Sequence, residues 1–377
     1  MASVWYLGEV VPRVVVPWLS LLPSRPRPAG AAGVGAAGAA TARSDGAATA
    51  DDPAIAEAVR VLRGGGLVAF PTETVYGLGA RALDPSAIAR VFAAKGRPAR
   101  HPLIAHVMDE TGARALAAAW PYAASILARA FWPGPLTIVV PRAPHVPGAI
   151  AGGADSVAVR APAHPVARAI LAALGEPLAA PSANRYQSLS PVTAAHVVKS
   201  LGDAVDLVVD GGPTTEGIES TVVDVRGGDV VVLRPGAIDL AALRAVVPAR
   251  LHHAEPPADG EGRASPGMDA RHYAPRAALI LAGAGDAERA AIDARARPGK
   301  DGAPAKVALV VRAEPSAAID ASFVVHVLPA DAKGYERSLF ATLHAADDAG
   351  CDVVVVEAVP DGDAWLAARD RLARARA

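Results

Sequence analysis

The sequence predicts an α/β protein made of two domains. From residue 52 onward, short apolar runs alternate with amphipathic segments, and Gly or Pro residues separate them. This alternation is typical of strands and helices that follow one another along a chain. A chain of 377 residues is longer than a typical domain with a single hydrophobic core. Residues 247–275 show no periodic spacing of apolar residues, which indicates a linker. We therefore expect an N-terminal domain at residues 51–246, a linker at 247–276 and a smaller domain at 277–377.

The elements of the N-terminal domain follow from the apolar runs and their end signals. Asp84 as N-cap followed by Pro85 should begin a helix that ends near Lys95-Gly96. Helices are expected at residues 53–63, 84–96, 111–120, 122–132, 165–174 and 190–201, the last capped by Ser190-Pro191. Strands are expected at residues 67–70, 103–108, 136–140, 156–160, 177–180 and 206–210, with a hairpin of 221–225 and 230–233. A loop is expected directly after the first strand.

The C-terminal domain shows the same alternation in a shorter segment. Strands are expected at residues 278–281, 307–311, 323–328 and 352–357, and helices at 287–295, 335–349 and 364–376. This order predicts a small three-layer domain with a mostly parallel sheet. The turn Gly283-Ala284-Gly285 lacks the third glycine of a dinucleotide-binding loop, so we interpret it as an ordinary turn. We interpret the basic segment 369–376 as a solvated helix face rather than a tRNA contact.

The first fifty residues differ from the rest of the chain. Residues 4–22 are apolar, but Glu9, Arg13 and two prolines interrupt them, unlike the unbroken apolar run of a signal peptide. Residues 23–50 are almost wholly Ala, Gly, Pro, Ser and Thr, which bury too little side chain to offset the entropy of ordering. We expect a disordered extension at residues 1–50.

Charge and cysteine content exclude several classes of protein. The formal net charge of −1 provides no overall field that would hold the protein on nucleic acid or an anionic membrane. Cys351 is the single cysteine, which excludes a disulfide framework and a multi-cysteine metal site and fits a reducing cytosol. The sequence has no uncharged run of about 18 residues, the length that a membrane-spanning helix needs. We expect a cytoplasmic protein that binds small ligands, without stable binding to nucleic acid or membranes.

Polar residues cluster where expected strands end, the usual place of a ligand crevice in an α/β sheet. The segment PTETVYGLG at 71–79 offers hydroxyls and backbone N–H groups to a polar ligand, or is a turn capped by Thr. Lys95 and Arg97 bracket a Gly-Pro turn and could clamp a triphosphate, or could compensate the dipole of the helix that they end. No GxxxxGK[ST] loop is present, so side chains would have to supply the charge. His106 is a ligand contact or a half-buried structural histidine.

A second group of polar residues lies further along the chain. Arg160 ends an apolar strand, where it must reach solvent or meet an anion such as the carboxylate of an amino acid. Ser182 and Asn184 belong to a Pro-led loop and could face one nucleotide, or could shape a turn. Ser190 is an N-cap or part of an anion site at a helix N-terminus. The hairpin adds Ser220 and Arg234 at its strand ends.

Taken in order, these motifs resemble one family. PTETVYGLG, KGRP, PLxxH, SVAVRxP, PSAN, STVVD and LRPG, spread over residues 55–246, are similar to the motifs of the YrdC-like threonylcarbamoyl-AMP synthases. SPGM at 265–268 and RHYAP at 271–275 resemble the linker of the long, two-domain form of that family. The resemblance implies a YrdC-like twisted open sheet with a concave ligand crevice, followed by a small Rossmann-like C-terminal α/β domain.

The resemblance also implies a reaction and a set of site residues. Threonine, bicarbonate or CO2, and ATP with Mg²⁺ would give threonylcarbamoyl-AMP, which a tRNA threonylcarbamoyl transferase uses to make N6-threonylcarbamoyladenosine at position 37. Lys95 and Arg97 would carry the catalysis. The residues implied for threonine are Thr74, His106, Arg160, Ala180 and Ser220. Those implied for ATP are Lys95, Arg97, His101, Ser156, Ser182, Asn184, Ser190, Arg234 and, folding over the nucleotide from the linker, Tyr273. His101 departs from the family, in which asparagine is expected at this position.

Two other functions are alternatives to this one. Carbamoyl transfer through carbamoyl-AMP, in hydrogenase-maturation proteins, uses a related fold, but those larger chains carry zinc fingers that one cysteine cannot build. An RNA-binding module would need a basic surface with interleaved aromatic residues, and the balanced charge and the absence of that interleaving count against it.

Overall fold

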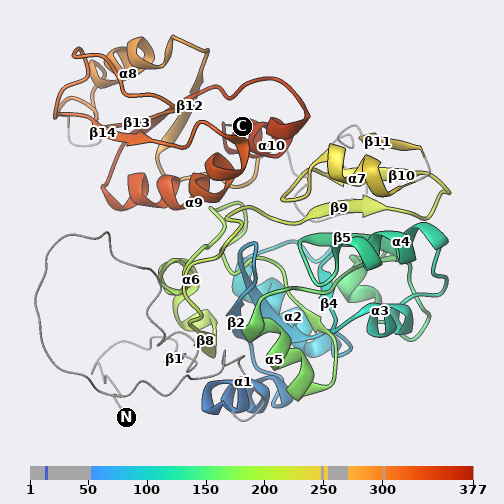
Figure 1. The fold of residues 1–377 in the computed structure, drawn as a ribbon. Helices are drawn as coiled ribbons and strands as arrows, with labels where there is room; N and C mark the ends of the chain where they lie inside the picture. The colour runs from blue at the N-terminus through green and yellow to red at the C-terminus, as the bar shows by residue number, and fades with distance from the viewer. Residues whose placement is uncertain (1–12, 16–51, 248–249, 254–270, 300–301, 377) are drawn as a thin grey trace, which may run out of the picture.

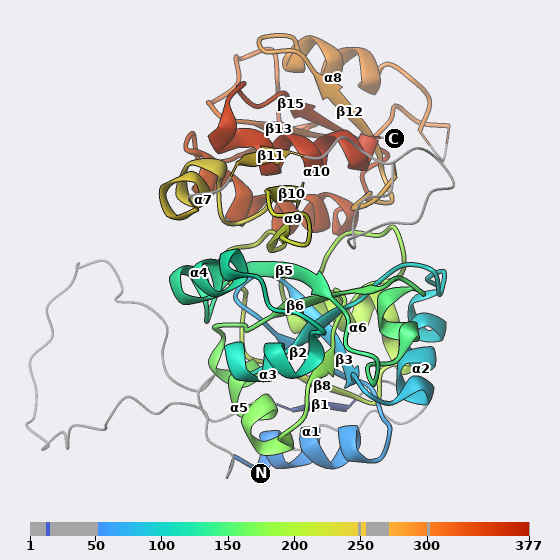
Figure 2. The same ribbon diagram turned by 90° about the vertical axis from the view of Figure 1, so that its right-hand side faces the viewer.

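The computed structural model describes residues 13–15, 52–247, 250–253, 271–299 and 302–376. The described residues form an eleven-stranded mixed sheet and a separate four-stranded sheet. Figures 1 and 2 show that helices flank both sheets, and that α9 and α10 of the C-terminal domain lie between its sheet and the rest of the molecule. The prediction of two α/β units is confirmed.

The large sheet has the strand order β1-β8-β2-β3-β7-β4-β6-β5-β9-β10-β11. Its strands are β1 Arg13–Val15, β2 Val68–Pro71, β3 Tyr76–Arg81, β4 Ile104–His106, β5 Leu136–Pro141, β6 Ser156–Arg160, β7 Leu178–Ala179, β8 Leu207–Val209, β9 Thr221–Asp224, β10 Val230–Arg234 and β11 Leu251–His253. The helices around it are α1 Pro53–Arg63, α2 Pro85–Lys95, α3 Glu110–Leu116, α4 Tyr122–Phe131, α5 Pro165–Leu174, α6 Ala194–Leu201 and α7 Leu240–Val246. The predicted hairpin is confirmed, since β9 and β10 pair antiparallel.

Both faces of the large sheet are covered. On one face, α1 and α5 pack Ile55, Leu62 and Ile170 against Val68 and Phe70 of β2. On the other face, helices including α2, α4 and α6 pack against the same sheet and form the largest apolar cluster of the described residues. Because both faces are buried, ligands can reach the sheet mainly at the ends of its strands.

The helix boundaries that rest on capping chemistry agree with the prediction. The side chain of Asp84 accepts hydrogen bonds from the backbone N–H groups of Ser86 and Ala87, and Pro85 opens α2. Gly96 ends this helix with φ of 62°, a left-handed conformation that glycine adopts without a side-chain penalty. The same signals place α1 between Asp52 and Gly64.

Two predictions within the N-terminal domain were wrong. The segment expected to be a loop after the first strand contains β3, which pairs antiparallel with β2. Its glycines hide the strand pattern, and Gly79 is needed because a Cβ there would lie 2.5 Å from a ring carbon of Phe70. Ser190 does not cap a helix either: α6 begins at Ala194, and the side chain of Thr193 caps it by accepting from His196 N.

Strands also occur where none was expected. Arg13–Val15 lies inside the expected disordered extension, yet it pairs parallel with β8, from Arg13 with Leu207 to Val15 with Val209. The rest of residues 1–50 lies outside the described residues. In the expected linker, β11 adds to the other edge of the sheet by pairing parallel with β10. The motif SPGM at 265–268 also falls outside the described part of the chain.

The C-terminal domain confirms the predicted three-layer arrangement. It contains β12 Ala278–Ala282, α8 Ala287–Arg295, β13 Val307–Val311, β14 Val324–Val327, α9 Ala332–Asp348, β15 Val353–Glu357 and α10 Leu366–Arg376. The four strands run parallel in the order β12-β15-β13-β14. The helix α8 covers one face, and α9 with α10 cover the other.

The two domains share an apolar core. Val75, Leu189 and Ile218 of the N-terminal domain belong to the same buried cluster as Phe340 and Leu343 of α9. Tyr273 of the linker lies in this cluster as well. The C-terminal domain is therefore held against the part of the N-terminal domain where the polar motifs lie. Among the residues that the structure describes, no helix has the length and apolar character needed to cross a bilayer.

Candidate functional site

A cleft with about 510 Å³ of space between protein atoms, part of it open to solvent, lies at the ends of several strands of the large sheet. Its walls come from the β2–β3 connection, from β4, β6 and β10, from the loop after β7 and from the linker. Nearly all the polar motifs singled out in the sequence contribute to it. Segments from residue 72 to residue 273 thus meet at one place.

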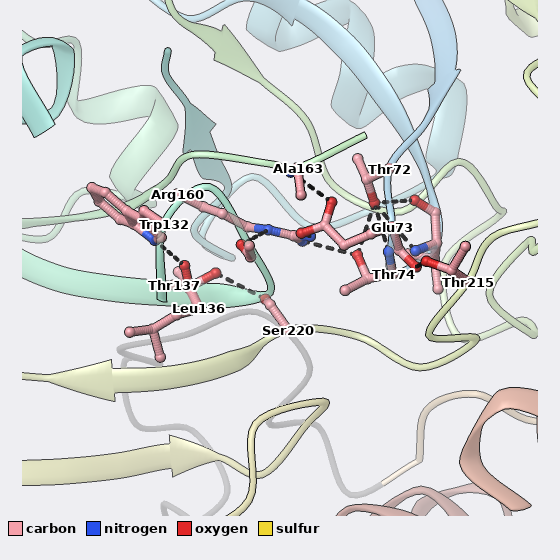
Figure 3. A network of polar contacts seen from close by, with 12 residues as sticks. Thr72, Glu73, Thr74, Trp132, Leu136, Thr137, Arg160, Ala163, Thr215 and Ser220 are labelled. Carbon is pink, nitrogen blue, oxygen red and sulfur yellow. Dashed lines mark hydrogen bonds and ion pairs between the residues drawn. The ribbon is translucent and has the colours of Figure 1, made fainter. Parts of the chain in front are cut away.

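All five residues that the resemblance implies for threonine line the cleft, and we call the part that they form the threonine end. Thr74, His106, Arg160, Ala180 and Ser220 line this region. The guanidinium of Arg160 donates to Thr74 Oγ1 at 2.9 Å and forms an ion pair with Glu73 Oε1 at 2.6 Å (Figure 3). The other oxygen of Glu73 accepts from the backbone N–H of Ala163 at 3.0 Å. Arg160 is buried and paired, so the alternative that it reaches solvent is wrong.

Glu73 sets the charge of this end of the cleft. Burial opposes its ionisation, but the positive charge and hydrogen bond of Arg160, with the Ala163 N–H, hold the pKa of Glu73 below its ordinary value. The two ions therefore form a charged pair that leaves little net charge. The motif around Glu73 gives no sign of this role, because the partner Arg160 is 87 residues away along the chain.

Neutral polar groups complete the threonine end. Burial and the nearby Arg160 charge lower the pKa of His106 to about 3, so its imidazole is neutral at physiological pH. Its Nδ1 lies 3.4 Å from the carbonyl oxygen of Ile104. The hydroxyls of Ser220 and Thr137 lie 2.8 Å apart (Figure 3). This end can thus offer hydroxyl and imidazole hydrogen bonds together with a guanidinium.

The other end of the cleft is rich in cations. Arg97 and Arg234 are buried and line it. Arg234 donates to the carbonyl oxygen and hydroxyl of Ser220, at 2.8 and 3.0 Å. The pKa of the buried His272 is well below its ordinary value because of burial and because of the charges of Arg97, Lys95, Arg234 and Arg371. A neutral imidazole surrounded by four cations marks a region suited to an anion.

Lys95 does not line the cleft. Its ammonium donates to the backbone carbonyls of Ser182 and Asn184. Of the loop that these residues form, Ser182 lines the cleft. Burial, and then the charge of Arg97, hold the pKa of Lys95 well below its ordinary value. Lys95 therefore supports the loop directly and does not itself line the cleft.

The remaining residues expected at the nucleotide divide into two groups. Arg97, Ser182, Arg234 and Tyr273 line the cleft, whereas Lys95, His101, Ser156, Asn184 and Ser190 are buried outside its lining. The amide nitrogen of Asn184 donates to the carbonyls of Arg185 and Ser188, so this side chain shapes the loop. Ser190 Oγ donates to Glu219 Oε1 at 2.5 Å. The ring of His101 lies 5.5 Å from that of Tyr186.

The linker closes one side of the cleft through His272 and Tyr273. Tyr273 has φ of 60°, an uncommon conformation for a bulky residue, and its hydroxyl is buried without a hydrogen-bond partner among the described residues. The backbone N–H of His272 donates to the carbonyl of Arg374 in α10 at 3.1 Å, and that of Ala274 donates to the carbonyl of Gln187 at 3.0 Å. The segment is thus fixed on both sides, with an unsatisfied hydroxyl at the cleft.

Sequence reasoning missed two charged residues near this side. Glu219 lines the cleft and directly precedes the STVVD motif, which is the only signal that could have suggested it. Arg371 belongs to the basic segment that we interpreted as a solvated face, and for this residue the interpretation was wrong. Its side chain is 1% exposed, and an ion pair with Glu219 at 2.7 Å compensates its buried charge.

Comparison with known proteins assigns both halves of the chain. Residues 60–236 match the Sua5/YciO/YrdC family, described as telomere recombination, and residues 238–377 match the family described as the C-terminal domain of threonylcarbamoyl-AMP synthase. The threonylcarbamoyl-AMP synthase of Pyrococcus abyssi is 41% identical over 316 residues, which are 83% of this chain and 91% of that protein. The protein of the same name from Bacillus subtilis is 36% identical over 329 residues, 86% of this chain and 93% of that protein.

Solved structures agree with the sequence relatives. The crystal structure of P. abyssi Sua5 complexed with L-threonine is similar with a TM-score of 0.76 and 40% identity, and it covers 85% of this chain and 94% of that chain. The match extends over both domains rather than the large sheet alone. The chain therefore belongs to the threonylcarbamoyl-AMP synthase family, in its long two-domain form.

Proposed function

We propose that this protein is an L-threonylcarbamoyladenylate synthase, a nucleotidyltransferase that forms threonylcarbamoyl-AMP and pyrophosphate from L-threonine, bicarbonate or CO2, and ATP. The observation that carries the proposal is the division of one cleft into a nearly neutral end with Arg160 and hydroxyls, and an end with excess positive charge. The first end suits an amino acid and the second suits a triphosphate. Relatives named for this activity span most of the chain.

Arg160 binds the carboxylate of threonine in this proposal. A guanidinium has five N–H donors. Three donate to the carbonyl of Gly134, to Thr74 Oγ1 and to Glu73 Oε1. One N–H on each terminal nitrogen remains for a ligand, and two parallel N–H groups match the geometry of a carboxylate. Thr74, His106 and Ser220 surround the remaining polar atoms of threonine, while Ala180 contacts its methyl group.

The reaction proceeds through a carbamate. Bicarbonate, where it is supplied, takes up a proton and loses water to give CO2. The neutral amine of threonine bonds to the carbon of CO2 and releases a proton to water, and a carbamate oxygen then attacks the α-phosphorus of ATP. The bond from the α-phosphorus to the bridging oxygen breaks, and pyrophosphate leaves. Carbamates are short-lived in water, so positioning, charge stabilisation and exclusion of water carry the catalysis.

Cations at the second end stabilise the leaving pyrophosphate. Arg97 and Arg234 contact the phosphates, and Lys95 adds its charge from below the Ser182–Asn184 loop while holding that loop in place. Ser182 and Tyr273, which both line the cleft, contact the nucleotide. The residues behind the lining, His101, Ser156, Asn184 and Ser190, act by fixing those walls.

Mg²⁺ enters with ATP as part of the substrate. Glu219 in the lining of the cleft and Glu73 behind it are each engaged by an arginine and are poor candidates for further metal ligands. We therefore propose that phosphate oxygens and water hold most of the coordination sites of Mg²⁺, which neutralises charge on the departing pyrophosphate. The product is a reactive mixed anhydride, so it is passed to a tRNA threonylcarbamoyl transferase that makes N6-threonylcarbamoyladenosine at position 37.

The test is pyrophosphate release with threonine, bicarbonate and ATP, each omitted in turn. We expect release that requires all three, and a product with the mass of threonylcarbamoyl-AMP. Arg97→Ala should lower kcat/KM for ATP by at least about a hundredfold, since charge-assisted contacts to a leaving group are lost. Arg129→Ala, on the exposed side of α4, is the matched control and should leave the rate unchanged. Release that is independent of threonine would refute the proposal.

A further inference from the structure

Arg371 is a fully buried cation that the C-terminal domain contributes to the edge of the cleft. It lies in α10, and its side chain is 1% exposed. Burying a charge is costly unless partners satisfy it. Its Nε donates to Glu219 Oε2 at 2.7 Å, and its Nη2 donates to the carbonyl of Pro235 at 2.9 Å. Both partners belong to the N-terminal domain, and its Nη1 donates to Asp370 of its own helix at 2.5 Å.

The guanidinium of Arg371 also lies over the ring of Tyr273, with its central carbon 4.9 Å from the ring centroid. In a buried place such a cation–π contact is stronger than at the surface. The same helix holds the backbone next to this ring, through the hydrogen bond from His272 N to Arg374 O. One helix thus fixes both the backbone and the ring of Tyr273, which lines the cleft and whose buried hydroxyl has no hydrogen-bond partner among the described residues.

A second consequence concerns Glu219 and Arg234. Glu219 receives Arg371 on one carboxylate oxygen and the hydroxyl of Ser190 on the other. Arg234 donates to the carbonyl oxygen and hydroxyl of Ser220, which directly follows Glu219 in the chain. A carboxylate that is engaged by Arg371 and Ser190 competes less for Arg234. The position of Arg371 thus favours contact between Arg234 and a phosphate.

We propose that Arg371 is a positioning residue for the reaction: it holds Tyr273 over the nucleotide end of the cleft and keeps Glu219 away from Arg234. The C-terminal domain thereby completes the active site without contacting substrate through Arg371 itself. This inference rests on the proposed function for its kinetic consequences, whereas the positioning of Tyr273 is independent of the reaction.

The test compares Arg371→Lys with Arg369→Lys in the full-length chain. Lysine keeps the charge but loses the planar fork that binds Glu219 and stacks on Tyr273. Arg369 lies in the same helix and pairs with the exposed Asp361, which makes it the matched control. We expect Arg371→Lys to raise KM for ATP about tenfold, because a buried cation–π contact and a charged hydrogen bond are lost. KM for threonine should rise by less than about twofold. The control should change neither value.

Two further measurements separate positioning from a general loss of structure. Amide hydrogen exchange at residues 272–274 of the ligand-free chain should quicken in Arg371→Lys and not in Arg369→Lys, at temperatures well below the thermal unfolding of either variant. In a Tyr273→Leu background, Arg371→Lys should raise KM for ATP by less than about threefold, because the two changes act through one contact. Should Arg371→Lys not fold, Glu219→Gln, which weakens the same pair, should give the same ATP-selective effect.

The outcomes distinguish this inference from the proposed function. If the unaltered chain shows no threonine-dependent pyrophosphate release, the proposed function fails, and the exchange measurement still decides whether Arg371 holds Tyr273. If the chain is active but exchange at residues 272–274 is unchanged in Arg371→Lys, the inference is overturned alone. Equal increases of KM for ATP and threonine would overturn it as well, since they indicate a purely structural effect.

Discussion

Replacing Glu73 by glutamine should destabilise the N-terminal domain strongly. In the folded protein, the Glu73 carboxylate accepts from Arg160 at 2.6 Å and from Ala163 N at 3.0 Å, with the side chains of the ion pair 9% and 4% exposed. Glutamine keeps the shape but leaves Arg160 as a buried cation without a counter-charge. Breaking a buried ion pair by removing one partner costs about 3–5 kcal/mol. Glutamine still accepts one hydrogen bond, so we expect a loss near the lower limit, about 3 kcal/mol.

The matched control is Glu176→Gln. Glu176 also pairs with an arginine, through two hydrogen bonds to Arg81 at 2.9 and 3.1 Å, but both side chains are about one-third exposed. Solvent screens such a pair, and its loss should cost less than about 1 kcal/mol. Urea unfolding, followed by circular dichroism, gives the change in the free energy of unfolding for each variant. It is obtained from the shift of the urea concentration at the midpoint and from the slope of the free energy against urea concentration. Equal losses for the two variants would refute the view that the buried Arg160–Glu73 pair organises this end of the cleft.

The pH dependence of the Glu73 effect has a defined sign. The folded protein lowers the pKa of Glu73 relative to its ordinary value of 4.5. The unfolded chain therefore binds a proton more readily, and the pair stabilises the fold fully above pH 4.5. This contribution is lost as the pH falls through the lowered pKa. The difference between the unaltered protein and Glu73→Gln should thus be largest near neutral pH and shrink below pH 4.5.

Three other predictions concern the domain interface, the threonine pocket and β3. The stacked rings of His196 and His344, 3.7 Å apart, have pKa values lowered by burial to about 4 and about 3. Below pH 6.5 the unfolded state binds more protons than the folded state, so the melting temperature should fall as the pH is lowered from 6.5 toward 4. The fall should be less steep in His344→Phe. Parallel profiles of melting temperature against pH for the two proteins would contradict this. With serine as the substrate in place of threonine, kcat/KM for pyrophosphate release should be about fivefold lower, because burial of the threonine methyl group contributes about 1 kcal/mol. Equal values for the two amino acids would show that the methyl group is not buried. Gly79→Ala should cost about 1–3 kcal/mol in urea unfolding, because the new Cβ would lie 2.5 Å from the Phe70 ring; an unchanged midpoint would show that the ring can move aside.

Most secondary structure was predictable because its causes are local. Asp84, Pro85 and Gly96 define α2 through hydrogen bonds and backbone angles that involve only neighbouring residues. Failures occurred where distant parts of the chain decide the structure. The strand β3 contains glycines that strand patterns disfavour, and it exists because β2 and β7 pair with it on either side. The strand β1 likewise depends on the exposed edge of β8.

The candidate site was predictable as a set of residues and less so as an arrangement. Motif order pointed to the hydroxyls, arginines and histidine that meet in the cleft. It did not indicate that Ser190 hydrogen-bonds to Glu219 instead of capping a helix, or that Lys95 binds loop carbonyls. Motifs record which residue types are present, whereas orientation depends on the partners that the fold supplies.

Local sequence signals are sufficient to predict the two α/β domains, the helix ends and the residue types from which a site for an amino acid and a triphosphate can be built. Tertiary structure alone decided which charges neutralise one another. Glu73 and Arg160 are 87 residues apart in the chain, and Glu219 and Arg371 are 152 apart. The physical reason is that capping and periodicity act within a few residues, while a buried charge is stable only beside a counter-charge that folding brings to it.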